Sequence, residues 1–213
     1  MHNEFNLNKL KSLFSLAWFD IKLRYARSLL GPLWITLSTI ILISGLSFVF
    51  VSLFAIPLRE TMPWVAIGII IWTYISTMID DSTEIFNNNL ILNVKISVID
   101  IAIIGIFKNL IILLHNAVII IFVLLVFQIN LTINIFFIFY GLCIILINSF
   151  SVTIIFGILC LRYRDFILII KNLLYLLFLM TPIFWTPSVL TDNRIILADV
   201  NILYQIIQTI RDP

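Results

Sequence analysis

Residues 7–37 read LNKLKSLFSLAWFDIKLRYARSLLGPLWITL, a basic segment that runs directly into a long apolar one. At about 100° per residue, one helical face of this segment carries an apolar stripe made of Leu10, Leu13, Phe14, Ala17, Trp18, Ile21 and Tyr25. The opposite face carries a second stripe made of Leu16, Phe19 and Leu23. A helix that only lies on a membrane needs one apolar stripe. Two stripes predict a helix wedged between the bilayer and either the rest of the protein or a partner.

Polar side chains separate the two stripes, and a Gly-Pro pair ends the helix. The flanks are Lys9, Asp20 and Arg27 on one side and Lys11, Ser15 and Lys22 on the other. Gly31-Pro32 breaks the helix, because Gly suits the position after a helix and Pro cannot donate to a continuing turn. We predict an interfacial amphipathic helix characterised by Trp18, Asp20, Lys22, Arg24, Tyr25, Gly31 and Pro32. The alternative is a basic juxtamembrane helix that only fixes membrane orientation.

The composition is that of an integral membrane protein. Of the 213 residues, 62% are apolar and only 11% are charged, with a mean hydropathy of +1.16. A soluble domain is about half apolar and about a quarter charged. Cys143 and Cys160 would lie about 25 Å apart within one helix, too far for a disulfide.

The apolar runs predict an all-α, polytopic membrane protein with five spanning helices. We assign residues 1–32 to the N-terminal segment with its interfacial helix, and residues 33–213 to the transmembrane domain. The predicted spans are residues 33–56, 63–79, 109–127, 134–161 and 166–185. Pro57–Glu60 is expected to form a short turn. Residues 90–107 are apolar but include Lys95 and Asp100, so we interpret them as an interfacial or partly re-entrant segment.

The distribution of basic residues predicts a cytoplasmic N-terminus. With that orientation ten of the 13 basic residues lie inside, namely Lys9, Lys11, Lys22, Arg24, Arg27, Lys95, Lys108, Arg162, Arg164 and Lys171. The remaining three, Arg59, Arg194 and Arg211, lie outside. This asymmetry satisfies the positive-inside rule for cytoplasmic-membrane proteins.

Polar residues within the spans have structural and functional interpretations. Ser149, Thr153 and Gly157 form a small-residue stripe that favours close helix packing, either within the chain or at a dimer face. His115, Asn116 and Asn148 are expected mainly to form hydrogen bonds between helices, with a functional role as the alternative. The five predicted spans contain no Asp or Glu, which weighs against a proton- or sodium-driven carrier.

Aromatic and acidic residues supply the candidate sites. Trp72 and Tyr74 are candidates for a substrate channel, since aromatic rings can stack against sugar faces. Asp80, Asp81 and Glu84 either end a helix or form the acidic metal site of an enzyme that acts on lipid-linked sugars. No glycine is followed by Lys, so the chain has no phosphate loop of the G-x-x-x-x-G-K kind.

Several motifs together resemble the permease subunits of ABC transporters that export polysaccharides such as O-antigen, capsule or teichoic acid. The N-terminal motifs are LAWFDIKLRY at residues 16–25 and SLLGPLW at residues 28–34. The others are Arg162-Tyr163-Arg164-Asp165, TPIFW at residues 181–185, and Asn201, Tyr204 and Arg211-Asp212-Pro213 near the end. Ile202 stands where the family usually has Pro, which is expected to loosen a turn on the external side. The family also has a sixth span after Arg-Asp-Pro, so a chain ending here is expected to insert but to assemble poorly.

The resemblance implies a homodimer in the inner membrane, docked on a separate cytoplasmic ATP-binding subunit. ATP and magnesium would bind to that subunit, so no cofactor is expected in this chain and no nucleic acid is expected as a partner. The substrate would be a lipid-linked glycan that leaves through a channel at the dimer interface. Contacts with the ATPase would fall on a coupling segment around residues 87–94 and on the turn at residues 162–165. The residues concerned are Asn87, Asn88, Asn89, Leu90, Asn93, Arg162, Arg164 and Asp165.

These expectations favour an exporter permease over two other classes of protein. One rival is a membrane-embedded enzyme that acts on polyprenyl-linked sugars through the acidic residues 80–84. The other is a self-sufficient secondary transporter.

Overall fold

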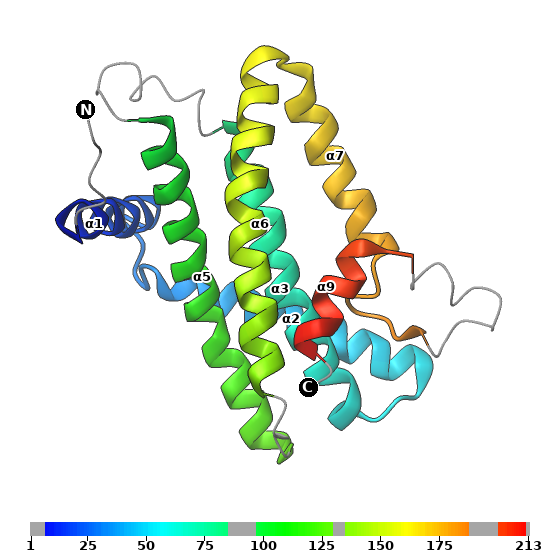
Figure 1. The fold of residues 1–213 in the computed structure, drawn as a ribbon. Helices are drawn as coiled ribbons and strands as arrows, with labels where there is room; N and C mark the ends of the chain where they lie inside the picture. Colours follow the sequence, from blue (N-terminus) through cyan, green and yellow to red (C-terminus); the bar gives the residue numbers. More distant parts are fainter. Residues whose placement is uncertain (1–6, 85–96, 130–134, 188–199, 212–213) are drawn as a thin grey trace.

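The computed structural model describes residues 7–84, 97–129, 135–187 and 200–211, apart from the side chains of residues 84 and 135–139. Within these ranges the chain forms seven helices and no strand, so the all-α prediction is confirmed there (Figure 1). The helices are α1 (Leu7–Arg24), α2 (Leu33–Phe54), α3 (Leu58–Glu84), α5 (Val98–Phe127), α6 (Ile135–Arg162), α7 (Asp165–Met180) and α9 (Ile202–Arg211).

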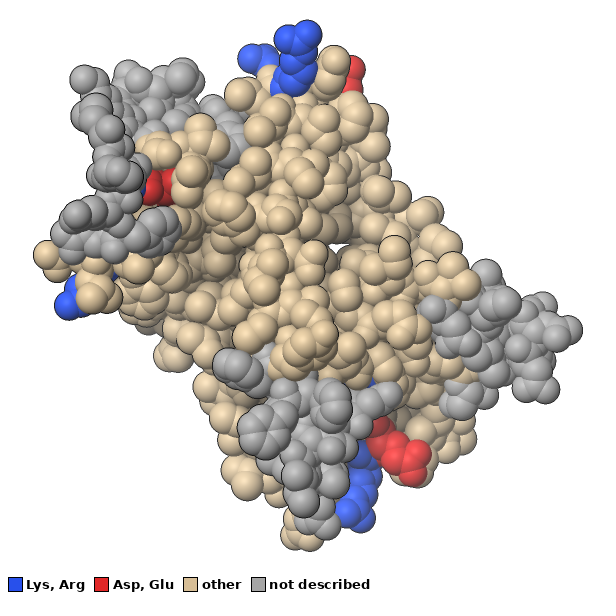
Figure 2. Space-filling view, viewed as in Figure 1, with Lys and Arg blue, Asp and Glu red and all other residues tan. Residues whose placement is uncertain are grey.

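In the part of the chain that the structure describes, four helices are long and apolar enough to cross a membrane: α2, α3, α5 and α6. Among them α3 is the central one, since it packs against α2, α5, α6, α7 and α9. The apolar window of α3 is 56% buried, whereas that of α2 is only 17% buried. Figure 2 shows that the middle of one face of the molecule carries neither basic nor acidic side chains. These features indicate a membrane protein.

Helix α1 lies crosswise to α5 and packs against it (Figure 1). Its first predicted stripe faces the other helices, since Ala17 and Ile21 are buried in a cluster with Ile35, Ile111 and Ile112. The second stripe is exposed, with Leu16, Phe19 and Leu23 among the uncovered apolar side chains. The bundle therefore covers one of the two stripes predicted from periodicity, and what covers the other stays a prediction.

Two helices are longer than the sequence predicted. Helix α3 already begins at Leu58, inside the expected turn, and continues past residue 79 to Glu84. Helix α5 is continuous from Val98, so the described part of the segment at residues 90–107 is not a separate interfacial element. Asp100 and Lys108 are tolerated there because Lys9 and Asp20 of α1 pair with them.

The fifth expected span, residues 166–185, is only partly helical. Helix α7 has 16 residues and ends at Met180, so it is about 24 Å long, against about 30 Å for the hydrocarbon core. The chain then turns at residues 181–185. The later helix α9 packs against α3 and α6 and buries Tyr204, Ile207 and Ile210.

The small-residue stripe of α6 lies inside the chain. Ser149, Thr153 and Gly157 are all buried, and the Ser149 hydroxyl is 2.9 Å from the Tyr74 hydroxyl of α3. This burial confirms the intramolecular interpretation of the stripe over the dimer-face alternative. Close packing also brings Gly141 of α6 against Thr209 and Ile210 of α9.

Candidate functional site: a cavity between α2, α3 and α7

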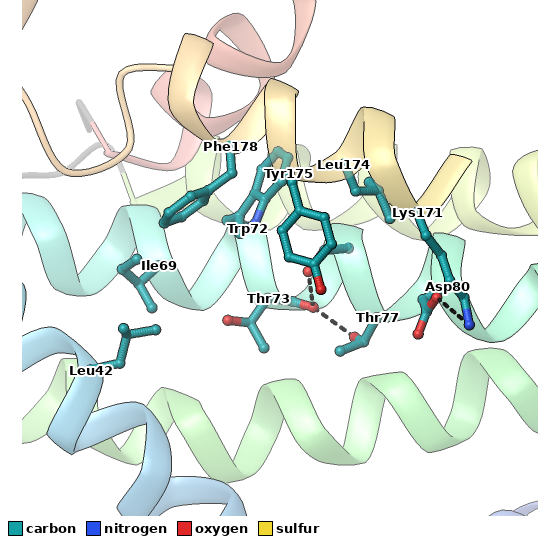
Figure 3. A pocket seen from close by; sticks show the side chains of 11 residues that line it. Leu42, Ile69, Trp72, Thr73, Thr77, Asp80, Lys171, Leu174, Tyr175 and Phe178 are labelled. Atoms are coloured by element: carbon teal, nitrogen blue, oxygen red, sulfur yellow. Dashed lines mark hydrogen bonds and ion pairs between the residues drawn. The ribbon is translucent and has the colours of Figure 1, made fainter. Parts of the chain in front are cut away.

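A cavity of about 550 Å³ lies where α2, α3 and α7 meet. Figure 3 shows the side chains that line it, several of them pointing from α3 and α7 into the same space. The lining residues are Leu42 of α2, Ile69, Trp72, Thr73, Ser76, Thr77 and Asp80 of α3, and Lys171, Leu174, Tyr175 and Phe178 of α7.

The α3 wall follows from helical periodicity. Ile69, Thr73, Ser76 and Asp80 recur every three or four residues, which places them in one row along the helix. Ser76 and Thr77 donate their hydroxyl hydrogens to the backbone carbonyl oxygen of Thr73, at 3.2 and 2.6 Å. Their oxygen atoms are therefore left as hydrogen-bond acceptors along the cavity wall.

The cavity is polar at one end and aromatic at the other. At the polar end the Lys171 ammonium lies 3.6 Å from the Asp80 carboxylate, and both side chains are partly exposed. At the other end the Trp72 and Phe178 rings are 5.6 Å apart, and the Phe178 and Phe184 rings are 5.2 Å apart. Phe50 of α2 continues this aromatic group, 5.2 Å from Phe184. Such a wall can hold a molecule with both apolar faces and hydrogen-bonding groups.

The two predicted channel residues lie on different faces of α3. Trp72 lines the cavity, but Tyr74 does not. Two helical steps rotate a side chain by about 200°, so Tyr74 points to the far side of the helix. There it is 1% exposed and bonded to Ser149. Ser149 donates its own hydrogen to Ile145, so Tyr74 is the donor in this pair.

Asp80 and Asp81 of α3 are held by basic side chains from three other helices. Asp81 lies 2.9 Å from Lys108 and 3.7 Å from Arg24, and it accepts a hydrogen bond from Asn109. Asp80 instead pairs with Lys171 across the cavity. The described residues hold no cluster of three or more His, Cys, Asp or Glu side chains that could bind a metal ion.

The predicted interfacial residues of α1 are held against the bundle by polar and aromatic contacts. Trp18 stacks on His115 with ring centroids 6.1 Å apart, and the Lys22 ammonium lies 5.4 Å from the Trp18 ring. Asp20 pairs with Lys108 at 3.5 Å, and Arg24 pairs with Asp81. Other members of the set have structural roles: Tyr25 packs in the cluster around Ala17, Gly31 has a φ of 56°, and Pro32 precedes α2.

The predicted ATPase contacts fall partly outside the described residues. Asn87, Asn88, Asn89, Leu90 and Asn93 all lie there. Arg162, Arg164 and Asp165 form the exposed turn between α6 and α7, which carries the basic side chains at the top of Figure 2. The Arg162 guanidinium lies 5.9 Å from the Tyr163 ring.

The intramembrane polar residues have mixed environments. The His115 Nδ1 atom is 2.9 Å from the Ile111 carbonyl oxygen of the same helix, and Asn148 donates to the Ile144 carbonyl oxygen. Asn116 is 1% exposed. The side chains of His115 and Asn148 therefore bond within their own helices, and not between helices as expected.

Most of the cavity wall was not predicted from the sequence. The sequence did contain a signal for part of it, a row of hydroxyls at helical spacing within an apolar run, formed by Thr73, Ser76 and Thr77. This row leads to Asp80. Lys171 and Tyr175 were not predictable, because nothing in the sequence shows that α7 lies beside α3.

No family model matches the sequence, and no curated protein matches it.

Proposed function

We propose that this chain is the membrane subunit of an exporter that moves a lipid-linked polysaccharide outward across the inner membrane. The observation that carries the proposal is the cavity, in which the rings of Trp72, Tyr175 and Phe178 share a wall with a row of hydroxyls. Sugars present C–H faces that stack on aromatic rings and hydroxyls that need hydrogen-bond partners. The resemblance of the sequence motifs to polysaccharide-exporting permeases supports the same substrate class.

The energy source in this proposal is a separate ATP-binding subunit on the cytoplasmic side, where the N-terminus also lies. Two copies of the chain form the permease, and ATP and magnesium bind to the partner subunit. The basic turn at Arg162 and Arg164 and the coupling segment at residues 87–94 contact that subunit. Supporting this orientation, Lys108, Lys171 and the α6–α7 turn all belong to the end of the bundle where α3 and α6 finish.

The enzymatic rival receives less support from the same contacts. Asp80 and Asp81 are two of the three acidic residues that it would need, and each is engaged by a lysine from another helix. Sugar transfer by the purified chain alone, without an ATPase, would favour this rival over the exporter.

The proposal is tested in cells that depend on an exporter for surface polysaccharide. The chain is expressed with its candidate ATPase partner, and surface glycan is measured for Thr73→Val combined with Ser76→Ala. Both changes remove a cavity hydroxyl at nearly constant size, so we expect less export at an unchanged protein level. The matched control is Ser52→Ala, since Ser52 is exposed and bonds only to its own helix. Export that is insensitive to the double substitution would contradict a sugar-binding role for the cavity.

Purification gives a second test of the proposal. We expect the chain to co-purify with an ATP-binding subunit and to hydrolyse no ATP by itself, because it lacks a phosphate loop. Cysteines placed along residues 87–94 and at Arg164 should crosslink to that subunit. A scan in which no position crosslinks would count against this docking surface.

A further inference from the structure

Arg211, the last residue of α9, packs into the side of the bundle. Its guanidinium lies 3.7 Å from the centre of the Trp64 ring of α3. It also donates hydrogen bonds to the carbonyl oxygens of Pro182 and Ile183, both at 3.1 Å. An arginine is costly among apolar helices, so a position like this one requires specific partners.

The hydrogen bonds from Arg211 satisfy backbone carbonyl groups that follow the end of α7. Helix α7 ends at Met180, and carbonyl groups beyond a helix end have no partner within the helix. An apolar environment supplies no water to replace those partners. Two of these carbonyls bind the planar guanidinium, which can also stack on an aromatic ring.

A second contact ties the other end of α9 to the same turn. The Asn201 amide donates to the Thr181 hydroxyl, while its oxygen accepts from the backbone N–H groups of Leu203 and Tyr204. Both ends of this ten-residue helix are therefore bonded to residues 181–183.

Gly68 of α3 allows the turn at residues 181–183 and the Arg211 side chain to pack closely against that helix. A Cβ atom at Gly68 would lie 2.5 Å from the Ile183 carbonyl oxygen and would also collide with the Arg211 guanidinium. The Ile183 side chain is completely buried beside it. The absence of a side chain at residue 68 thus makes room for the turn and for the arginine that holds it.

The next residue of this turn, Phe184, lies at the aromatic end of the cavity. Its ring is 5.2 Å from Phe178 of α7 and 5.2 Å from Phe50 of α2. Phe178 lines the cavity, whereas Phe184 and Phe50 do not, so the pair lies just beyond its end. The Phe184 ring bridges α2 and α7 at this point.

We infer that Arg211 acts as a latch that keeps this end of the cavity closed. By holding the carbonyls of Pro182 and Ile183, it fixes the backbone that carries Phe184 between α2 and α7. Release of the latch frees Phe184 and opens the cavity at the end opposite the Lys171–Asp80 pair. The inference rests on the packing alone and does not depend on what passes through the cavity.

The test measures whether a thiol in the cavity reacts with a membrane-impermeant maleimide. Cys143 and Cys160 are replaced by Ser and Ala, and Thr73→Cys supplies the only thiol, in the full chain. Reaction is followed in intact cells and in inverted membrane vesicles, which expose opposite sides of the membrane to the maleimide. One of the two preparations therefore exposes the latched end to the reagent, whichever way the chain is oriented. With Arg211 intact, we expect fast reaction from one side only.

Arg211→Gln should let the thiol at residue 73 react from both sides. We expect the reaction rate from the closed side to rise about tenfold. This factor corresponds to the lower end of the free-energy range for losing a hydrogen bond to a charged group. Arg211→Lys should give a smaller rise, because an ammonium lacks the planar fork of the guanidinium. Phe184→Ala should open the same side while the latch stays in place.

Two controls separate a latch from general loosening. Arg59→Gln removes an exposed arginine near the start of α3 and should leave the closed side closed. Cys160 is completely buried in α6, and as the only thiol it should stay unreactive in Arg211→Gln. Continued protection of residue 73 in Arg211→Gln would overturn the inference. Exposure of Cys160 by the same variant would also overturn it, since Arg211 would then support the whole bundle.

Discussion

Asp81→Asn should destabilise the bundle, because it removes the anion that best satisfies a largely buried lysine. The Lys108 side chain is 12% exposed, and its ammonium lies 2.9 Å from Asp81 and 3.5 Å from the half-exposed Asp20. Asp81 also lies in the last turn of α3, where the helix dipole disfavours a carboxylate that has no cation beside it. Removal of either charge therefore leaves the other in an unfavourable place.

The size of the effect follows from the burial of the pair. Breaking a buried ion pair by removing one partner costs about 3–5 kcal/mol. Asp20 still lies near Lys108, and Asp81 is 21% exposed, so the free energy of unfolding should fall by about 2 kcal/mol instead. For a chain of this size that corresponds to a decrease in Tm of about 6 °C.

Thermal unfolding in detergent micelles checks this value through a double-mutant cycle. Lys108→Met should cost a similar amount, because it leaves Asp81 with Arg24 at 3.7 Å as its only close cation among the described residues. The double variant should lose about as much as either single one, since the pair acts as a unit. Matched controls are Glu60→Gln and Lys11→Met, which change exposed charges. Additive losses in the double variant, or singles that unfold like the parent, would refute the reasoning.

Four further substitutions probe three close contacts between helices, with thermal unfolding as the common measurement. Gly68→Ala should lower stability by about 2 kcal/mol, because the added methyl meets the Ile183 backbone oxygen, and parent-like stability would contradict this. Ser149→Ala should lower stability more than Tyr74→Phe does. Ser149→Ala leaves the buried Tyr74 hydroxyl without an acceptor, whereas in Tyr74→Phe the Ser149 hydroxyl still donates to the Ile145 carbonyl oxygen. The reverse order of stabilities would show that the donor is misassigned. Gly141→Val should weaken the packing of α9 on α6 by about 1–3 kcal/mol, and it should leave Tm unchanged if that contact does not form.

Predictions from the sequence were correct for features that depend on the residue pattern within a single helix. Periodicity placed Ala17 and Ile21 on a face that packs against the bundle, because a 3.6-residue repeat fixes which side chains share a face. The length of the apolar runs predicted the helices α2, α5 and α6, since a span needs about 20 apolar residues.

Two of the errors came from charges that a second helix neutralises. Lys95 and Asp100 suggested that α5 should begin later, and Asp80 and Asp81 suggested that α3 should end earlier. In the sequence alone the partner of an ionised group is unknown, so burial of that group is expected to cost its full desolvation free energy. The partners lie far away in the sequence, on α1, α5 and α7, and only the folded chain brings them together.

By itself the sequence determined that the chain is helical and apolar enough for a membrane, and which side chains share each apolar face of α1. These properties depend on local composition and on the helical repeat. The tertiary structure alone decided that Trp72 faces a cavity with Lys171 and Tyr175 of α7, and that Arg211 binds the turn after α7. Those contacts join residues about 30 to 100 positions apart, so they depend on how the helices pack and not on any local pattern.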